Sequence, residues 1–341
     1  MSRDGDYKLR TTAAHGSLNC PACGAGIDHQ PAATYTADQA AAHFCPPSRN
    51  PDRYERLRKA VVEIWQGDSS HVFFCSACGF GFGWPHAGGN ESYYGILHEQ
   101  AGYPANRWEY GWTIREVVAR ATEGGTLLDI GTGDGAFLQQ LPPGWHKAAT
   151  EGSETNREML RQKGIECFES LDTAASSHAG QFDVVTMFQV LEHIADFRTV
   201  LRGIWTLLRP GGTLVVSVPL ASAMRMQEEL TGWPDITPNH INKWSPEALE
   251  TVFASCGFMA DAPIEEPPGF RHAMSRVELI TRRQAAASPG SLAARAFRLR
   301  SRAMRRYVLA GITAVNLLGC IPLWKTLSRG SSFVLVGMKM P

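Results

Sequence analysis

Apolar and polar positions follow an alternating pattern between residues 126 and 219. Short apolar runs are separated by amphipathic segments in which apolar residues recur with a helical period. The runs predict strands at 126–131, 147–152, 165–169, 182–188 and 213–219, and the segments between them predict helices near 134–141, 153–163, 171–177 and 196–208. This alternation is typical of an α/β fold with a doubly wound, mostly parallel sheet.

The pattern continues beyond this stretch in a weaker form. Ser245 is suited to cap a helix, Pro246 to occupy its first position, and Gly257 to close it. A weak strand is expected at 258–266. The run SSFVLVGMKM, residues 331–340, is dense in apolar and β-branched residues, so we expect it to return to the sheet as the last strand.

Composition divides the chain into five segments. Residues 1–90 are rich in Cys, His, Pro and Gly and have little apolar periodicity. A linker and leading helix at 91–122 precede the α/β core at 123–269. Residues 270–330 predict a helical insertion that is Arg-rich and then apolar, and 331–341 hold the final strand.

A glycine-rich turn follows the first predicted strand, in TLLDIGTGDG. Its glycines, Gly131, Gly133 and Gly135, are spaced GxGxG, whereas a dinucleotide fingerprint is GxGxxG. Asp129 lies at the strand tip, where a carboxylate suits an ammonium group and a sulfonium better than a diphosphate. Glu151, at the end of the second strand, is placed to accept hydrogen bonds from ribose hydroxyls. Together these residues indicate S-adenosylmethionine as the ligand.

These motifs, with FDVVTMFQVLEHI and LRPGGTLVVSVP, resemble the class I S-adenosylmethionine-dependent methyltransferases over about residues 120–265 and the last ten residues. The resemblance implies a seven-stranded Rossmann-like sheet whose one antiparallel strand is the terminal run. It also implies roles for the cofactor-binding residues. Asp129, Gly131 and Gly133 would line the methionine end, Glu151 would hold the ribose, and Phe188 and Gln189 would border the sulfonium.

Two histidines are candidates for the chemistry. Methyl transfer is an in-line displacement that depends on positioning, and a hydroxyl acceptor must also lose a proton to a base. His240 is the first candidate for a base or acceptor contact, with ordering of its own loop as the alternative. His193 matches a histidine common in the family, and its alternative is a structural role that orients Glu192 and the following helix.

Two CxxC pairs lie in the first segment. Cys20 and Cys23, with Cys75 and Cys78, predict a structural zinc held by four thiolates in a zinc-ribbon-like module, although the 51 intervening residues require a long insertion. Cys45 or His43 remains an alternative as one of the ligands. Four protein ligands would leave no open position for catalysis.

Charge and hydropathy bear on the partners and the compartment. Lys plus Arg and Asp plus Glu are equal at 33 each, so no global field favours nucleic acid. The N-terminus lacks the apolar core of a secretory signal, and we expect a cytoplasmic protein. Six arginines at 295–306 precede 18 uncharged residues, which indicates either a helical lid or an interfacial element that touches anionic lipid at the inner face of the membrane.

The sequence therefore predicts an enzyme that methylates a small-molecule, sugar or glycoconjugate acceptor, on oxygen. An RNA methyltransferase that grips RNA with the zinc module is the first alternative. A non-catalytic protein that binds the cofactor and docks a partner is the second. The acceptor, the methylated atom and the oligomeric state stay open at this level.

Overall fold

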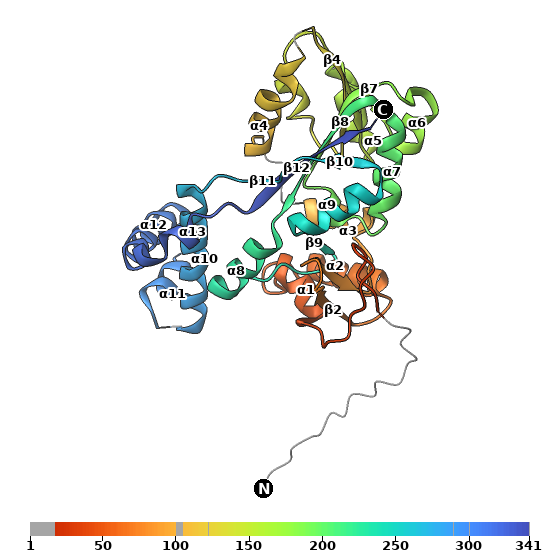
Figure 1. Ribbon diagram of the computed structural model, residues 1–341. Coiled ribbons are helices and arrows are strands. Elements are labelled where there is room, and N and C mark those ends of the chain that lie inside the picture. The colour runs from red at the N-terminus through yellow and green to blue at the C-terminus, as the bar shows by residue number, and fades with distance from the viewer. Residues whose placement is uncertain (1–17, 100–104, 122, 289, 300, 341) are drawn as a thin grey trace.

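A mixed sheet forms the centre of the protein in a computed structural model that describes residues 18–99, 105–121, 123–288, 290–299 and 301–340 (Figure 1). Its strands follow the order β10-β12-β8-β7-β4-β5-β6, and β11 pairs with β12 at one side. In chain order they are β4 (Gly125–Ile130), β5 (Trp145–Thr150), β6 (Glu166–Phe168), β7 (Phe182–Phe188), β8 (Leu208–Pro219), β10 (Phe258–Ala260), β11 (Ile264–Glu265) and β12 (Ser332–Lys339).

The strand directions confirm the predicted α/β class. Strands β6, β5, β4, β7 and β8 are parallel neighbours, whereas β12 is antiparallel to both β8 and β10. The terminal run thus supplies the antiparallel strand, as expected. The carboxyl ends of the parallel strands meet at one edge, which is where ligands bind in doubly wound sheets.

Helices flank the sheet. They are α4 (Trp108–Glu116), α5 (Glu154–Gln162), α6 (Leu171–His178), α7 (Phe197–Leu207), α8 (Ala221–Thr231) and α9 (Pro246–Ser255), with single 3₁₀ turns at Val118–Arg120, Leu138–Gln140 and Leu191–His193. Of these, α5, α6, α7 and α9 have side-chain N-caps. Asp196 caps α7 by accepting a hydrogen bond from the amide of Thr199, and Ser245 caps α9 through the amide of Ala248.

The helix expected near 134–141 is wrong, because only the turn Leu138–Gln140 forms there. Its upstream end is taken up by glycines with positive φ, the last of which is Gly135 at +77°. Downstream, Pro142 and Pro143 disfavour helical geometry at the preceding residue and remove backbone donors.

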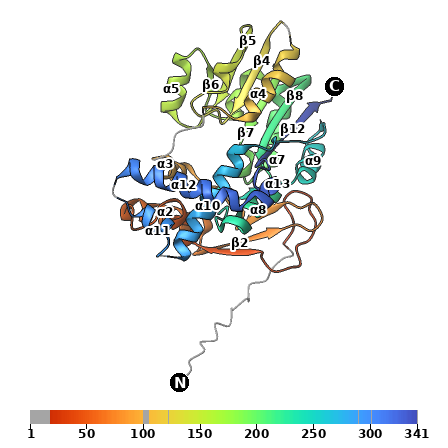
Figure 2. The same ribbon diagram turned by 90° about the vertical axis from the view of Figure 1, so that its left-hand side faces the viewer.

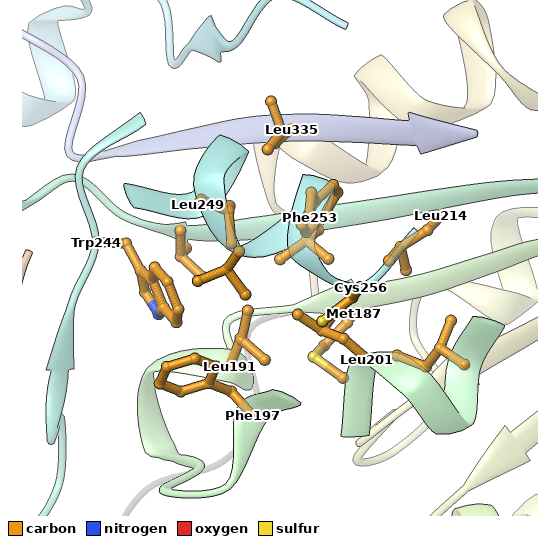
Figure 3. Close-up of a cluster of buried hydrophobic side chains, with 14 of the residues drawn as sticks. Met187, Leu191, Phe197, Leu201, Leu214, Trp244, Leu249, Phe253, Cys256 and Leu335 are labelled. Atoms are coloured by element: carbon orange, nitrogen blue, oxygen red, sulfur yellow. The ribbon is translucent and has the colours of Figure 1, made fainter. Parts of the chain in front are cut away.

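One hydrophobic core joins the sheet to the helices and to the N-terminal region. Figure 3 shows Met187 of β7 and Leu214 of β8 beside Phe253 of α9, with Phe197 and Trp244 at the other end of the cluster. Phe80 and Phe82, from the Cys-rich segment, belong to the same core, and the ring centroids of Phe80 and Trp244 lie 4.7 Å apart.

The N-terminal region is built around a second, small sheet of order β1-β2-β3-β9. Its elements are β1 (Ala33–Thr36), α1 (Ala37–Phe44), α2 (Pro51–Trp65), β2 (Ser69–Phe74), β3 (Gly81–Trp84) and α3 (Glu91–His98), and β9 (Asn242–Lys243) joins them from far along the chain. Arg198 of α7 donates to the carbonyls of Pro21 and Ala22, and the hydroxyl of Ser245 donates to the carbonyl of Cys78 at 2.6 Å. The Cys-rich segment is thereby fixed to helices of the central sheet.

The segment before the last strand is helical, as expected, and lies to one side of the main sheet (Figure 2). It comprises α10 (Phe270–Ala287), α11 (Leu292–Phe297), α12 (Arg302–Gly319), the 3₁₀ turn Ile321–Leu323 and α13 (Trp324–Leu327). The buried guanidinium of Arg276 in α10 donates to the carbonyls of Leu327 and Arg329, at 2.7 and 2.6 Å, and so attaches α10 to the end of the insertion. Among the described residues no single helix has the length and composition to cross a membrane. Residues Ala303–Gly319 and Ile321–Leu327 meet that criterion only as a pair, bent by 73°.

We predict that Ser245→Ala destabilises the protein more than a cap substitution alone would. Loss of the N-cap costs about 1 kcal/mol. Loss of the bond to the carbonyl of Cys78 adds about 1 kcal/mol, because a buried acceptor loses its donor. The free energy of unfolding is to be measured by urea denaturation followed by tryptophan fluorescence.

Ser291→Ala is the matched control, because Ser291 caps α11 through the amide of Ala294 at 3.1 Å, the distance that Ser245 has to its own partner amide. Equal losses of stability for the two variants would contradict a second role for Ser245.

Candidate active site

The glycine turn after β4 adopts a conformation that favours glycine. Gly131, Gly133 and Gly135 have φ angles of +68°, +59° and +77°. A Cβ atom on Gly131 would lie 2.8 Å from Val190, and one on Gly135 would lie 2.6 Å from Leu160. The turn therefore packs closely against the chain that follows β7 and against α5, and it leaves its backbone at the ligand-binding edge of the sheet.

Asp129 is buried beneath this turn. Its side chain is 3% exposed, and its Oδ1 accepts a hydrogen bond of 2.7 Å from the hydroxyl of Thr186 on β7. Burial raises the pKa of Asp129 to about 6, even though that hydrogen bond favours the ionised form. A cationic group beside this carboxylate would be strongly favoured.

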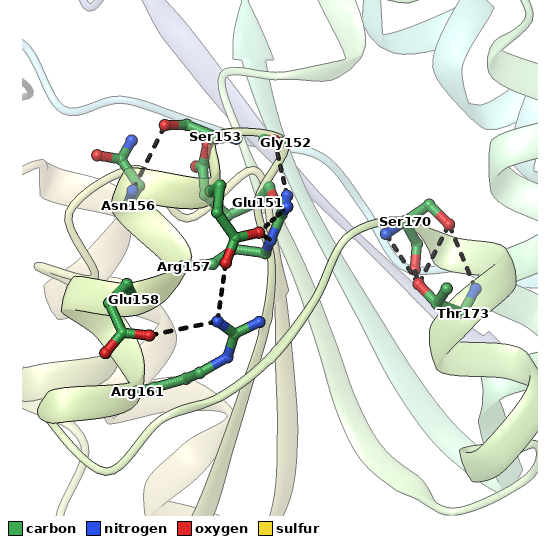
Figure 4. A network of polar contacts seen from close by, with 10 residues as sticks. Glu151, Gly152, Ser153, Asn156, Arg157, Glu158, Arg161, Ser170 and Thr173 are labelled. Atoms are coloured by element: carbon green, nitrogen blue, oxygen red, sulfur yellow. Dashed lines mark hydrogen bonds and ion pairs between the residues drawn. The ribbon is translucent and has the colours of Figure 1, made fainter.

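Glu151 lies at the end of β5 and faces the same turn. One carboxylate oxygen accepts from the amide of Gly133 at 3.2 Å, and the other accepts from the amide of Ser153 at 3.0 Å. Figure 4 shows Arg157 beside it, and this guanidinium donates to the carbonyls of Glu151 and Gly152 at 2.8 and 2.6 Å. The predicted ribose-binding acid is therefore held in a fixed position next to the glycine turn.

Gln189 follows β7 and joins a buried polar group. Its φ is +56°, rare for a residue other than glycine, and its side-chain amide donates to the hydroxyl of Ser217 at 3.2 Å. That hydroxyl donates to Glu109 of α4, also at 3.2 Å. Glu109 is 2% exposed, and burial raises its pKa. Glu109 was not predicted from the sequence, where the only signal for it is an acidic residue among the aromatics of WEYGW.

Phe188 is placed by an aromatic cluster. Its ring centroid lies 4.8 Å from that of Phe137 and 5.1 Å from that of Tyr110, both in edge-on geometry. The ring is 7% exposed and belongs to the core on the α4 face of the sheet. The ring of Phe188 is therefore packed in the core, and only the backbone of this residue is available at the end of the strand.

His193 and His240 come from different loops and meet with their ring centroids 4.8 Å apart. Nδ1 of His240 lies 2.8 Å from Oδ1 of Asp235. The other carboxylate oxygen of Asp235, Oδ2, accepts a hydrogen bond of 2.6 Å from Nζ of Lys243. Nδ1 of His193 lies 2.6 Å from the carbonyl oxygen of Asn239. Nδ1 of each imidazole therefore faces an oxygen atom, and Nδ1 of His193 also lies 2.9 Å from the hydroxyl of Tyr94.

Glu192 adds a buried carboxylate to this pair. It is 1% exposed, and within the described part of the chain neither carboxylate oxygen has a hydrogen-bond partner. Burial raises its pKa to about 7. Burial acts to lower the pKa of His240, but the negative charges of Asp235 and Glu192 outweigh it and the pKa is raised. Ligand atoms of Glu192, His193 and His240 all lie within 4.8 Å of one another, and the charges of Glu192 and His240 each act on the pKa of the other group.

The amide of Asn242 holds this cluster in place. Its side chain is fully buried, and Nδ2 donates to the carbonyls of Leu191 and Ile194, at 3.0 and 2.7 Å, on either side of Glu192 and His193. Its Oδ1 lies 2.7 Å from Nε2 of His86 in the N-terminal region. Asn242 therefore connects the turn after β7 to the small sheet.

A pocket of about 240 Å³ opens beside His240. Its walls come from the N-terminal region, α8, the loop before β9 and the segments at the ends of β8 and β12, as His43, Phe44, Pro219, Ala223, Met224, Gln227, Trp233, Pro234, Asp235, Asn239, His240 and Ser331. The rings of His43 and Trp233 lie 4.5 Å apart. The contribution of His43 and Phe44 to this pocket depends on a long-range contact that the sequence pattern does not reveal.

The four cysteines of the two CxxC pairs meet in one cluster. Sγ of Cys20 lies 3.7 Å from that of Cys78, Sγ of Cys23 lies 3.6 Å from that of Cys75, and all four lie within 4.8 Å. A tetrahedral zinc with Zn–S bonds of about 2.3 Å places its sulfurs about 3.8 Å apart, so this donor set fits such an ion.

The two cysteine turns have matching geometry, and the alternative ligands lie elsewhere. The amide of Gly24 donates to the carbonyl of Cys20, and that of Gly79 to the carbonyl of Cys75, both at 2.9 Å. Cys45 is instead buried among α1 and α2, while His43 lies at the pocket.

Comparisons with known proteins agree with this geometry. Residues 109–262 match the family described as "Methyltransferase domain". The ubiquinone biosynthesis O-methyltransferase of Chelativorans sp. is 28% identical over 155 residues, which cover 41% of this chain and 61% of that protein. The enzyme of the same name from Marinobacter nauticus is 31% identical over 104 residues, covering 28% of this chain and 44% of that protein.

These matches define a domain rather than the whole protein. The chain spans between about two fifths and three fifths of the length of the curated relatives it matches. Among solved structures, a SAM-dependent methyltransferase from Archaeoglobus fulgidus aligns with a TM-score of 0.44 at 15% identity, over 72% of this chain and all of that one. The segment from 109 to 262 thus matches a methyltransferase domain, and the strand order of its sheet is that of the Rossmann-like methyltransferase fold.

Proposed function

We propose that this protein is an enzyme that transfers a methyl group from S-adenosylmethionine to a hydroxyl oxygen of a small-molecule, sugar or glycoconjugate acceptor. The observation that carries the proposal is the cluster of titratable groups Glu192, His193 and His240 beside a pocket at the ligand-binding edge of the sheet. The names of the curated relatives, which are O-methyltransferases, support oxygen as the methylated atom.

The residues at the strand ends fit the cofactor. When bound, S-adenosylmethionine supplies an electrophilic methyl group on a sulfonium. The buried carboxylate of Asp129 suits the cationic methionine end, and Glu151 suits the ribose hydroxyls. The close packing of Gly131 against Val190 fixes the course of the turn beside these two acids.

His240 is the proposed general base. The acceptor oxygen forms a bond to the methyl carbon while the carbon–sulfur bond breaks, and the hydroxyl proton passes to Nε2 of His240. Asp235 holds Nδ1 of this imidazole, and the charge of Glu192 stabilises the imidazolium that forms. Because the pKa of His240 is raised, the base form is populated only toward alkaline pH.

The pocket supports a compact acceptor rather than RNA. Its walls are mainly aromatic and apolar side chains with a few polar groups, and no Lys or Arg lies among the residues that line it. A phosphate-rich ligand would need such cations. An aromatic or sugar ring carrying a hydroxyl would pack on Trp233 and His43 and direct that hydroxyl toward His240.

The cysteine cluster is proposed to hold a structural zinc ion. All four positions of a tetrahedral ion would be filled by Cys20, Cys23, Cys75 and Cys78. The ion would stabilise the N-terminal region that contributes His43 and Phe44 to the pocket. The metal thereby supports acceptor binding without taking part in the reaction.

The first experiment is a screen with tritium-labelled S-adenosylmethionine and a panel of phenols, free sugars and nucleoside-diphosphate sugars. We expect label to enter at least one hydroxyl compound, and mass spectrometry then identifies the methylated atom. Label incorporated only into co-purifying RNA, and lost after RNase treatment, would contradict the proposal.

Asp129→Asn is expected to weaken binding of S-adenosylhomocysteine at pH 7.5 by about tenfold or more, because a charge-assisted hydrogen bond to the ligand ammonium is lost. Asn keeps the shape of the side chain and its contact with Thr186. With the pKa of Asp129 raised to about 6, the wild-type carboxylate becomes protonated as the pH falls through that value. Affinity, measured by calorimetry, should therefore decline below about pH 6.

The Asp129→Asn variant should show no such decline across the same pH range. A wild type that binds equally well at pH 5 and pH 7.5 would rule out an ionised Asp129 in the cofactor complex.

His240→Gln is expected to reduce kcat on the order of 10²-fold or more with the acceptor found in the screen, while binding of S-adenosylhomocysteine stays within about twofold. The wild-type profile of kcat/KM should rise with pH as His240 loses its proton, above the ordinary pKa of histidine. Glu192→Gln removes a charge that raises this pKa, so its rising limb should move to lower pH.

His146→Gln is the matched control, because His146 pairs with Glu166 at 2.9 Å on the surface, away from the pocket. If His240→Gln retained full kcat, or if the limb did not move in Glu192→Gln, His240 would not be the base.

Cys23→Ala is expected to lose a zinc ion that the wild type holds at one per chain, as measured by plasma mass spectrometry. Cys45→Ala should keep its zinc, because Cys45 lies outside the cluster. Zinc retained in Cys23→Ala and lost in Cys45→Ala would require a different ligand set.

A further inference from the structure

The insertion before the last strand carries a concentrated apolar surface. Eight of the sixteen exposed large hydrophobic side chains in the described part of the chain lie between residues 304 and 324. They are Met304, Tyr307, Val308, Val315, Leu318, Ile321, Leu323 and Trp324, which we call the α12 surface. Val315 and Leu318 are 68% and 67% exposed. Apolar patches of this kind mark interaction sites.

Helical spacing places the first five of these side chains on one face of α12. The opposite face packs inward, where Thr313 is buried and Ile312 contacts the alanine-rich cluster of α10 and α11. Asn316 donates to the hydroxyl of Thr281 in α10 at 2.8 Å. The helix is therefore held on its inner side, and its outer apolar face is a defined surface.

The chain segment that carries this surface has charges of one sign, and Glu265 and Glu266, from outside the segment, line a pocket with Trp324 and Lys325 at one end of the surface. From residue 279 to the end the chain contains no Asp or Glu and eleven Lys or Arg, although the whole chain is balanced. Arg305 and Arg306 lie at the start of α12, and Lys325 follows Trp324. A surface of apolar, aromatic and basic side chains complements an anionic lipid bilayer, whose headgroups are negative and whose interior is apolar.

We propose that the α12 surface docks the protein on an anionic membrane, with α12 lying along the interface. Spanning is disfavoured, because the chain returns directly after α13 to pair as β12 with β8 in the main sheet. The aromatic rings of Tyr307 and Trp324 suit the headgroup region. Among cellular membranes, the cytoplasmic leaflet supplies such a charge.

The insertion is also connected to the acceptor pocket. Trp233 lines that pocket and, on its other side, a groove of about 510 Å³ between α10 and α11. Arg282, Phe297 and Arg298 line the same groove. Docking through α12 would place α10 and α11, and the groove between them, near the lipid headgroups.

Flotation of the intact protein with vesicles tests the proposal without any methyl acceptor, so the result does not depend on the proposed reaction. We expect at least about tenfold more binding to vesicles of phosphatidylcholine mixed with phosphatidylglycerol than to phosphatidylcholine alone. Salt at 1 M, where the Debye length is about 3 Å, should release much of the bound protein.

Two pairs of substitutions separate the apolar and basic contributions. Val315→Asp with Leu318→Asp should abolish flotation, and Arg305→Glu with Arg306→Glu should lower it by about tenfold or more on the mixed vesicles. Met259→Asp with Met340→Asp is the control for the first pair, and Arg115→Glu with Arg120→Glu for the second, because these exposed residues lie elsewhere.

Wild-type protein that stays unbound, or test pairs that float as well as their controls, would overturn the proposal. A dimer in light scattering that Val315→Asp with Leu318→Asp converts to monomer, without any vesicle binding by the wild type, would instead assign the surface to a second copy of the chain.

Discussion

The buried amide of Asn242 is the contact on which the candidate active site depends. It satisfies two carbonyls of the turn that carries Glu192 and His193, and its oxygen meets His86 of the N-terminal region. A single side chain thus fixes the turn after β7 relative to the small sheet. The N-terminal region and the edge that carries the candidate active site are therefore joined by direct hydrogen bonds.

Buried carboxylates are the second theme of this edge. Asp129, Glu109 and Glu192 are each at most 3% exposed, and burial raises the pKa of all three. Desolvated acids weaken a fold unless something compensates them. A cationic ligand beside Asp129 and a protonated imidazole near Glu192 would be compensations of that kind.

Features that depend on neighbouring residues could be predicted from the sequence, whereas features that depend on distant contacts could not. The positions of the parallel strands follow from local alternation, and Asp129 and Glu151 are identified by their places at the ends of the first two of these strands. The pairing of β9 with β3 and the presence of His43 at the pocket join segments about 160 to 200 residues apart, for which no periodicity exists. The expected helix near 134–141 failed for a local reason, the prolines that follow it.

The insertion leaves and re-enters the sheet through neighbouring strands. Ile264 and Glu265 of β11 pair with Val334 and Phe333 of β12, and the amide of Ser331 bonds the carboxylate of Glu266 at 2.8 Å, which closes the neck between them. Residues 267–330 thus form an insertion whose two ends lie side by side, at the paired strands β11 and β12. Such an insertion can be exchanged, lengthened or deleted while the strands of the main sheet keep their register. Replacing this one segment could therefore change the surface on which the protein docks without changing the strand ends that carry the candidate active site.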